Sequence, residues 1–488
     1  MPEPGAPVAA PVATEGRPLE ARIRLAVALL FALALAQRLW NAWGVPPLTG
    51  YDSPGHAGYM LTILEEGALP HPFDGWSTFH PPLYYLLGSA VWGLLEPFGP
   101  RALVTGVRAI GSLAGLAAAF VALRLMLGLG IAPIVAAVST AVLLFVPVSQ
   151  LAGAMIGNEA LAACAVALAL PPLVRLQRDP ADLRAALLLG VLCGAALWVK
   201  YTTVLLLGAV FVPYLWRVPA RRELAALAAC LAVTGALASP VYLRNLAVSG
   251  TVIPLTRDRE PMKSAEEAMK IRDRRVSDFL WVPPGALLRP SLYHEPGKIG
   301  SYHNRNPAMT SVWGMTYASL WFDPFGHRTR VRDHRDGVWH GPVLALLGLG
   351  PTLAVLAGFL LAWIDLVRRR GRTPDAPLVV LATLGLAGFT SIAIGAPSPA
   401  ALKGSYLLAM GVPAAVFFGR AAMRLGPRLR AGLLAISCAA AAAAALVFTS
   451  GLLYPPQAMG VEVWTRIAQA LPKSYILQAM ERMLTGWM

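Results

Sequence analysis

The chain has 488 residues, of which 56% are hydrophobic and only 14% are charged. Soluble globular domains carry about 25% charged residues, so this composition excludes a soluble protein and predicts a membrane protein. The formal net charge is +15, but the arginines gather in short connections between apolar blocks, which is typical of cytoplasmic loops and not of nucleic-acid binding.

The apolar blocks predict eleven membrane-spanning helices, because about 20 apolar residues are needed to cross the hydrocarbon layer. We expect spans near residues 20–44, 102–126, 131–150, 159–176, 184–199, 201–216, 223–243, 341–366, 377–395, 404–420 and 431–452. The arginine-rich connections mark the cytoplasmic side of the membrane. They place the N-terminus inside and the C-terminus outside.

The chain divides into five parts. We expect a disordered cytoplasmic tail at residues 1–19, an N-terminal transmembrane module at 20–243, a large extracytoplasmic loop at 244–340, C-terminal spans at 341–452 and an extracytoplasmic tail at 453–488. The first outer loop, residues 45–100, carries helical stretches at 54–66 and 80–97. The second stretch is expected at the membrane interface, because a crossing there would move every later arginine cluster outside.

The first outer loop carries a candidate catalytic base. Ser53 as N-cap and Pro54 as first helical residue predict that Asp52 lies just ahead of a helix N-terminus, where the helix dipole favours its ionised form. His56 follows four residues later, on the same side of the first turn. Such a carboxylate suits a base that deprotonates an acceptor hydroxyl. The alternative is that Asp52 only caps the helix.

Other polar residues are expected on the same outer side. His80 precedes two prolines that fix the start of the interfacial helix, and Tyr84 and Tyr85 suit the headgroup layer, where we expect them to line a lipid entrance. Asn158 and Glu159 open a later span. Glu159 is either a second carboxylate of the site or an acid that only complements a helix N-terminus.

Three cations depart from the positive-inside rule. Lys200, Arg244 and Lys403 are expected at the outer ends of spans, and charges at such depths usually have partners and functions. They suit a phosphate group, which Arg244 would hold as a bidentate fork and the lysines as point charges. The alternative is that they pair with Asp52 or Glu159. The stretch from Trp313 to Asp323 is a candidate acceptor site.

Together these motifs resemble the GT-C membrane glycosyltransferases. The resemblance is greatest to the protein O-mannosyltransferase and aminoarabinose-transferase-like group (glycosyltransferase family 39-like), in its bacterial dolichyl-phosphate-mannose-transferase-like branch. Asp52 with His56 and Tyr59, and the segment 80–85, carry it. Weaker matches lie at 158–159, 200–202, 244–245 and 403–407, the last of which includes Tyr406.

The resemblance implies an all-α polytopic fold with about 11 transmembrane helices and extracytoplasmic juxtamembrane helices in the first outer loop. It also implies an inverting transferase in a bacterial-type inner membrane, which moves a sugar from a polyprenyl-phosphate donor to an extracytoplasmic glycan, lipid or protein. Asp52 would be the base or would organise a divalent metal, with His56 and Glu159 as the other candidate ligands. Ser53 stands where many relatives have a second acid.

A transporter or flippase of a lipid-linked sugar is the alternative function. It would explain the apolar composition and the outer cations equally well. Such a protein is expected to have broken helices and polar residues near the bilayer midplane, whereas the central parts of these spans are mostly Ala, Leu, Val and Gly. The sequence therefore favours the enzyme.

Overall fold

The computed structural model describes residues 16–216, 218–255, 263, 272–288, 310–324, 339–453, 461–471 and 474–485. Every regular element within these ranges is helical. Residues 16–19 were expected in a disordered tail but belong to α1 (Gly16–Gly44). The rest of that tail, and most of the 244–340 region, lie outside the described residues.

Eight described helices are long and apolar enough to cross a membrane, which makes the chain a multi-pass membrane protein. They are α1, α4 (Pro100–Gly128), α7 (Glu159–Arg178), α11 (Arg221–Ser249), α17 (His340–Arg368), α18 (Ala376–Gly395), the segment Pro399–Arg424 and α20 (Pro427–Val447). The segment Pro399–Arg424 consists of η4 (Pro399–Leu402), η5 (Gly404–Met410) and α19 (Gly411–Arg424).

The predicted spans 131–150 and 201–216 are broken in the structure. The first consists of α5 (Pro133–Phe145) and α6 (Pro147–Gly153), which meet at an angle of 54° and would make a ninth span if counted together. Pro147 explains the break, because proline disfavours a helical residue before it and cannot donate the next hydrogen bond. The second is divided into η2 (Tyr201–Val204), α9 (Leu205–Val210) and α10 (Val212–Leu215), and α8 (Leu183–Val199) before it is also short.

The spans pack through small residues that let neighbouring backbones approach closely. A Cβ atom at Gly358 of α17 would lie 1.8 Å from the carbonyl oxygen of Phe417 in α19, and one at Gly190 of α8 would lie 2.7 Å from that of Cys230 in α11. This is the usual way in which membrane helices associate, since burial from lipid provides little hydrophobic driving force.

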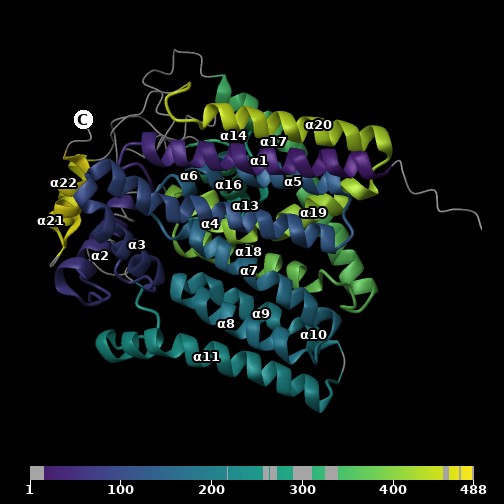
Figure 1. Ribbon diagram of the computed structural model, residues 1–488, viewed down its shortest axis with the longest axis horizontal. Helices are drawn as coiled ribbons and strands as arrows, with labels where there is room; N and C mark the ends of the chain where they lie inside the picture. Colours follow the sequence, from purple (N-terminus) through teal and green to yellow (C-terminus); the bar gives the residue numbers. More distant parts are fainter. Residues whose placement is uncertain are drawn as a thin grey trace, which may run out of the picture.

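The helices of the first outer loop cover one end of the bundle (Figure 1). These are α2 (Ser53–Glu66), α3 (Leu83–Leu95) and the short η1 (Glu96–Phe98), joined there by α21 (Val461–Gln469) and α22 (Ile476–Leu484). With 13 residues, α3 is about 20 Å long, which is too short to cross a hydrocarbon layer of about 30 Å. The interfacial assignment of this stretch is consistent with that length.

The arginine-rich connections lie at the other end. Helix α4 packs its N-terminal half against α3 and α22, and the carbonyl of Gly128 at its C-terminus accepts a hydrogen bond from Arg178. Arg420 pairs with Asp365 and Asp375 where α17 ends and α18 begins. The cationic connections and the first outer loop therefore lie at opposite ends of the bundle.

Two buried arginines fix the connections near the first outer loop. The Arg108 guanidinium in α4 donates to the carbonyls of Pro46 and Pro47, at 2.5 and 3.2 Å, just after α1. Arg38 in α1 donates to the Leu144 carbonyl at 3.0 Å and to Ser149 Oγ at 2.8 Å, on the two sides of the break between α5 and α6. Both side chains are at most 2% exposed, so hydrogen bonds to neutral oxygens must stabilise their buried charges.

Part of the predicted outer loop, residues 244–340, is buried against the helix bundle. Its described helices are α13 (Ser277–Leu280), α14 (Gly285–Leu288) and α16 (Val312–Trp321). Helix α16 packs against α6, α17 and η5. Ser319 Oγ accepts a hydrogen bond from the Gly404 amide at 2.6 Å and donates to the Leu402 carbonyl at 3.3 Å. Helix α16 therefore supports the turn that carries Lys403.

Candidate functional site

Asp52 itself is the N-cap position of α2, whereas the sequence analysis assigned that place to Ser53. Its carboxylate makes no capping hydrogen bond, and the Ser53 hydroxyl donates to the Thr49 carbonyl at 3.0 Å. The carboxylate instead accepts a hydrogen bond from Trp76 Nε1 at 3.1 Å and lies 3.4 Å from Lys403 Nζ. The alternative in which Asp52 only caps a helix is therefore contradicted.

A second ion pair lies on the same side of the bundle. Lys200 Nζ is 2.5 Å from a carboxylate oxygen of Glu159, the first residue of α7. The Lys200 ammonium lies 5.4 Å from the ring centre of Tyr406, and the Lys403 ammonium lies 4.5 Å from that of Tyr51. Both lysines are thus paired with acids, which was the alternative to phosphate binding in the sequence prediction. Each ammonium group also faces an aromatic ring that stabilises a cation.

The two acids, Lys403 and the two aromatic rings line one small pocket, whereas Lys200 does not line it. Its wall includes Asp52, His56, Glu159, Lys403, Ser405 and Tyr406. Ser405 is 2% exposed, and its hydroxyl has no hydrogen-bond partner among the residues that the structure describes. Asp52, Lys403 and Glu159, which are far apart in the sequence, are therefore brought together beside an unused hydroxyl.

The electrostatics of the pocket keep Asp52 ionised and His56 neutral at pH 7. Burial alone would raise the pKa of Asp52. The Lys403 ammonium, the charge that His56 carries when it is protonated at low pH, and the Trp76 hydrogen bond together outweigh burial and bring the pKa to about 2. Burial lowers the pKa of His56 to about 4, although Asp52 opposes that change. At pH 7 the Asp52 carboxylate therefore carries the negative charge of this pair, and the His56 ring carries no charge.

Tyr84 and Tyr85 do not line a lipid entrance, contrary to the sequence prediction. Both are 0% exposed, because α3 packs them against α2 in one apolar cluster. The Tyr85 hydroxyl lies 2.7 Å from His56 Nδ1, and the Tyr84 hydroxyl accepts a hydrogen bond from the Gly157 amide at 2.8 Å. The two tyrosines therefore fix the positions of His56 and Gly157, which line the pocket.

His80 and Asn158 lie beside the pocket without joining its ion pairs. The His80 ring stacks at 5.7 Å on that of His56, and its Nδ1 has no hydrogen-bond partner among the described residues. Burial holds the pKa of His80 well below its ordinary value, so the ring is neutral. The Asn158 amide donates to the Val199 carbonyl at 3.4 Å, which joins the start of α7 to the end of α8.

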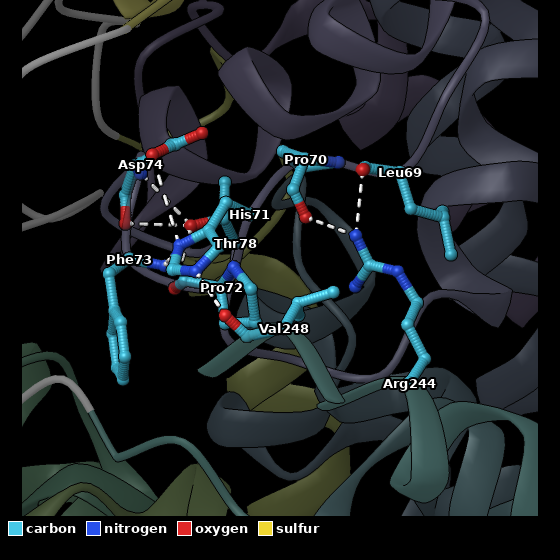
Figure 2. A network of polar contacts seen from close by, with 10 residues as sticks. Leu69, Pro70, His71, Pro72, Phe73, Asp74, Thr78, Arg244 and Val248 are labelled. Atoms are coloured by element: carbon cyan, nitrogen blue, oxygen red, sulfur yellow. Dashed lines mark hydrogen bonds and ion pairs between the residues drawn. The ribbon is translucent and has the colours of Figure 1, made fainter. Parts of the chain in front are cut away.

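Arg244 has a different role from the one predicted (Figure 2). Its guanidinium donates to the carbonyls of Leu69 and Pro70, at 2.8 and 2.7 Å. Beside it, His71 Nε2 lies 2.8 Å from the Val248 carbonyl near the end of α11. Arg244 does not line the pocket of Asp52. Both bonds come from one terminal nitrogen, Nη2, which ties Arg244 to the backbone of the first outer loop.

The candidate metal ligands do not form a metal site in this arrangement. Asp52 and Glu159 each hold a lysine, and His56 is engaged by a tyrosine hydroxyl. Among the described residues, no group of three or more His, Cys, Asp or Glu side chains is placed to hold an ion. Oxygen-rich cation sites need several such ligands to converge.

Three residues of the site were not identified from the sequence. Trp76 belongs to no motif, and Ser405 lies in the weak match at 403–407 without a predicted role. Only the tertiary structure brings Trp76 to Asp52 and Ser405 to the pocket. Tyr51 precedes Asp52 directly and lies against Lys403. The sequence signal that was available was the position of Tyr51 directly before the candidate acid.

A larger apolar cavity of about 690 Å³ lies next to the small pocket. It is bounded by α5, α16, α17, α18 and α19, and Leu407, Leu408 and Met410 of η5 line it. Lys403, Ser405 and Tyr406, on the same short segment, line the polar pocket. One turn of chain therefore separates a pocket for charged groups from a cavity for apolar ones.

The sequence matches no protein-family profile and no curated protein sequence. The fold does match solved structures. The Archaeoglobus fulgidus oligosaccharyltransferase tethered to an acceptor peptide aligns with a TM-score of 0.54 at 12% identity over 95% of this chain, and its complex with zinc and sulfate with a TM-score of 0.51 at 17% identity over 91%. ArnT from Cupriavidus metallidurans bound to undecaprenyl phosphate aligns with a TM-score of 0.40 at 16% identity, over 82% of this chain and 81% of ArnT.

The chain has a GT-C-like fold, and the predicted class of an all-α polytopic membrane protein is confirmed. It spans only 59% and 55% of the archaeal enzyme in the two alignments. At identities this low the likeness concerns the arrangement of helices. Function has to be argued from the pocket.

Proposed function

We propose that this protein is a membrane glycosyltransferase that transfers a sugar from a polyprenyl-phosphate donor to an extracytoplasmic acceptor, which is a glycan, a lipid or a protein. The observation that carries the proposal is the pocket lined by Asp52, Lys403 and Glu159. Asp52 pairs there with Lys403, and Glu159 pairs with Lys200, which does not itself line the pocket. A carboxylate and cations at one point suit a reaction that removes a proton and releases a phosphate.

In the proposed reaction the acceptor hydroxyl oxygen attacks the anomeric carbon of the sugar from the side opposite the phosphate. The bond between that carbon and the phosphate oxygen breaks, its electron pair leaves with the polyprenyl phosphate, and Asp52 takes the hydroxyl proton. The configuration at the anomeric carbon inverts. Lys403 and Lys200 stabilise the charge that develops on the phosphate.

The Asp52–Lys403 ion pair of the empty site favours an order in which the donor binds before the acceptor loses its proton. While Lys403 holds Asp52, the pKa of the acid is about 2, which makes it a weak base. A donor phosphate that takes over Lys403 removes that hold, so the pKa of Asp52 rises when the donor is bound. Proton removal from the acceptor then becomes easier in the loaded enzyme than in the empty one.

The apolar cavity beside η5 supports a lipid-linked donor. Its volume of about 690 Å³ is in the range of sites for small apolar ligands, about 300–1,000 Å³. The archaeal oligosaccharyltransferase with this fold has been solved in complex with dolichol phosphate and an inhibitory peptide. We propose that part of a polyprenyl chain occupies this cavity.

The positive-inside rule supports an extracytoplasmic site. The arginine-rich connections, among them Arg178 and Arg420, lie at the end of the bundle opposite the first outer loop. Cationic loops favour the cytoplasmic side. The pocket of Asp52 would then open on the extracytoplasmic side, where polyprenyl-linked sugars could meet envelope acceptors.

The proposal is tested with the purified full chain in detergent. Undecaprenyl phosphate carrying a hexose or a pentose serves as donor, and a membrane extract supplies acceptors. We expect the wild type to release undecaprenyl phosphate, and Asp52→Asn to release it about 100-fold or more slowly, because general-base catalysis contributes a factor of that size. Mass spectrometry of the released lipid measures the rate.

Asp74→Asn is the matched control, because Asp74 lies in the same loop without facing the pocket. Unchanged release by Asp52→Asn would contradict the proposed base. The transporter alternative predicts a different pattern, in which the wild type moves the lipid-linked sugar across a vesicle membrane without releasing undecaprenyl phosphate.

A further inference from the structure

The C-terminal helices pack against the helix that begins at Asp52. In Figure 1, α21 and α22 lie beside α2 and α3 at the end of the bundle. Met483 and Ala479 of α22 are 0% exposed because they share one apolar cluster with α2 and α3. Arg482 adds ion pairs to Glu65 at 2.6 Å and to Glu96 at 3.0 Å. This segment is therefore docked on the first outer loop.

Two glycines of α2 allow this close packing. Gly55 and Gly58 are three residues apart and lie on one face of the helix. A Cβ atom at Gly55 would lie 2.8 Å from Trp76 Cδ1, and one at Gly58 would lie 2.9 Å from Ile476 Cγ1 at the start of α22. The same face of α2 thus receives both the Trp76 loop and the C-terminal segment.

A chain of three side chains joins the C-terminal segment to the candidate base. Trp464 of α21 is 8% exposed, and its ring meets that of Trp76 edge-to-face, at 5.6 Å between centroids and 81° between planes. The indole N–H of Trp76 then donates to Asp52 Oδ1 at 3.1 Å. Edge-to-face aromatic pairs fix ring orientation, and here the orientation of the Trp76 ring decides where its N–H points.

We propose that Trp464 is a positioning residue that acts through Trp76 on Asp52, so that the C-terminal helices α21 and α22 form part of the site. Trp76 is attached to a loop between α2 and α3 and is only partly buried, so its ring needs a neighbour that limits rotation. Trp464 supplies that neighbour from a segment almost 390 residues away in the sequence. The expected effect of Trp464 on catalysis rests on the proposed function. The expected effect of Trp464 on the position of Trp76 does not.

The catalytic test is a double-mutant cycle on the full chain, with release of undecaprenyl phosphate as the readout per folded protein. We expect Trp464→Ala and Trp76→Phe each to lower kcat about tenfold, because small displacements of a reacting group cost at least that much, while KM for the donor stays within about twofold. Trp464→Phe should recover most of the rate because it keeps a ring edge against Trp76. The double variant Trp464→Ala with Trp76→Phe should be no slower than Trp76→Phe alone.

Thr465→Ala is the matched control, because its hydroxyl bonds only within its own helix, to the Val461 carbonyl at 2.8 Å. We expect its kcat to equal that of the wild type. A Trp464→Ala variant with wild-type kcat would overturn the inference. So would multiplicative losses in the double variant, since these would show that Trp464 acts independently of Trp76.

A second measurement separates this inference from the proposed function. Hydrogen exchange of the full chain reports the turn around Trp76, where the Gly75 amide donates to Thr78 Oγ1 at 2.9 Å. We expect faster exchange in this turn in Trp464→Ala, and not in Thr465→Ala, because exchange follows local opening. Unchanged exchange overturns the inference even if no glycosyl transfer is found. Faster exchange without any release of undecaprenyl phosphate overturns only the proposed function.

Discussion

At the scale of single residues, the Asp52–Lys403 pair governs how the pocket responds to pH. The two charges are 3.4 Å apart and come from segments 351 residues apart in the sequence. The Lys403 side chain is buried and that of Asp52 is about one-third exposed. Because water screens the pair only in part, each charge shifts the pKa of the other group. The ionisation of Asp52 is therefore a property of the pair.

Removing Lys403 should raise the acid limit of activity, which is the pH at which activity is lost on acidification. In Lys403→Gln the lowering effect of the ammonium is lost and burial, which raises the pKa of Asp52, remains. Activity should then be lost at a higher pH on acidification than in the wild type, whose Asp52 stays ionised down to a pH of about 2. The pH profile of kcat/KM measures this limit.

Lys200→Gln is the comparison for that profile. Lys200 pairs with Glu159, so its loss should weaken donor binding and leave the acid limit near that of the wild type. An acid limit that is the same in Lys403→Gln and in the wild type would show that Lys403 does not control Asp52.

His56 should not titrate in the neutral range. Burial brings its pKa to about 4, well below the ordinary value of about 6.5. The wild-type profile of kcat/KM should therefore be flat through pH 6.5, because His56 is already neutral there. An inflection near pH 6.5 that disappears in His56→Gln would contradict this assignment.

At the scale of elements, the contact between α11 and the first outer loop decides what Arg244 does. Its two hydrogen bonds to Leu69 and Pro70 carbonyls are of the charge-assisted kind, which contribute about 1.5–3 kcal/mol each where they are well formed. We expect Arg244→Ala to lower the free energy of unfolding by about 1–3 kcal/mol and to leave KM for the donor unchanged. Thermal unfolding in detergent and donor kinetics test the two parts.

Arg221→Ala, at the opposite end of the same helix, should change neither quantity. If Arg244→Ala instead raised KM for the donor about tenfold or more, which corresponds to about 1.4 kcal/mol, Arg244 would bind the phosphate as the sequence alone suggested. The carbonyl contacts of Figure 2 would then be replaced when the donor binds.

The elements themselves were predicted unevenly. The long apolar helices α4, α7, α17 and α18 follow from hydropathy, because length and composition are local properties. The breaks at Pro147 and in the segment Tyr201–Leu215 were not predicted, since a window of about 19 residues averages over a bend. Helix α16 was missed because its burial depends on α6 and α17 and not on its own sequence.

At the scale of the whole molecule, the packing of the bundle depends on close backbone contacts between α17 and α19, two helices that line the apolar cavity. Gly358→Ala would place a Cβ atom 1.8 Å from the backbone oxygen of Phe417, and a backbone atom cannot turn aside. We expect a loss of stability of about 1–3 kcal/mol, as for other overpacked cores. The fall in the midpoint of thermal unfolding in detergent measures it.

Gly235→Ala is the control for this substitution, because nothing lies within 4 Å of its added Cβ atom. It should be neutral or stabilising by up to about 1 kcal/mol, since alanine is the better helix former. If both variants lost stability equally, helix propensity and not packing would be the cause.

The sequence by itself determined that this is a multi-pass helical membrane protein, that a helix begins beside Asp52, and that Lys200 and Lys403 are exceptional cations. These conclusions depend on composition, on periodicity and on the chemistry of nearby residues. Only the tertiary structure decided that Lys403 pairs with Asp52, that Arg244 holds a loop, and that Trp464 reaches the site. The reason is physical: a charge or a ring acts on whatever lies within a few ångströms of it, and residues 351 positions apart reach that distance only after the helices have packed.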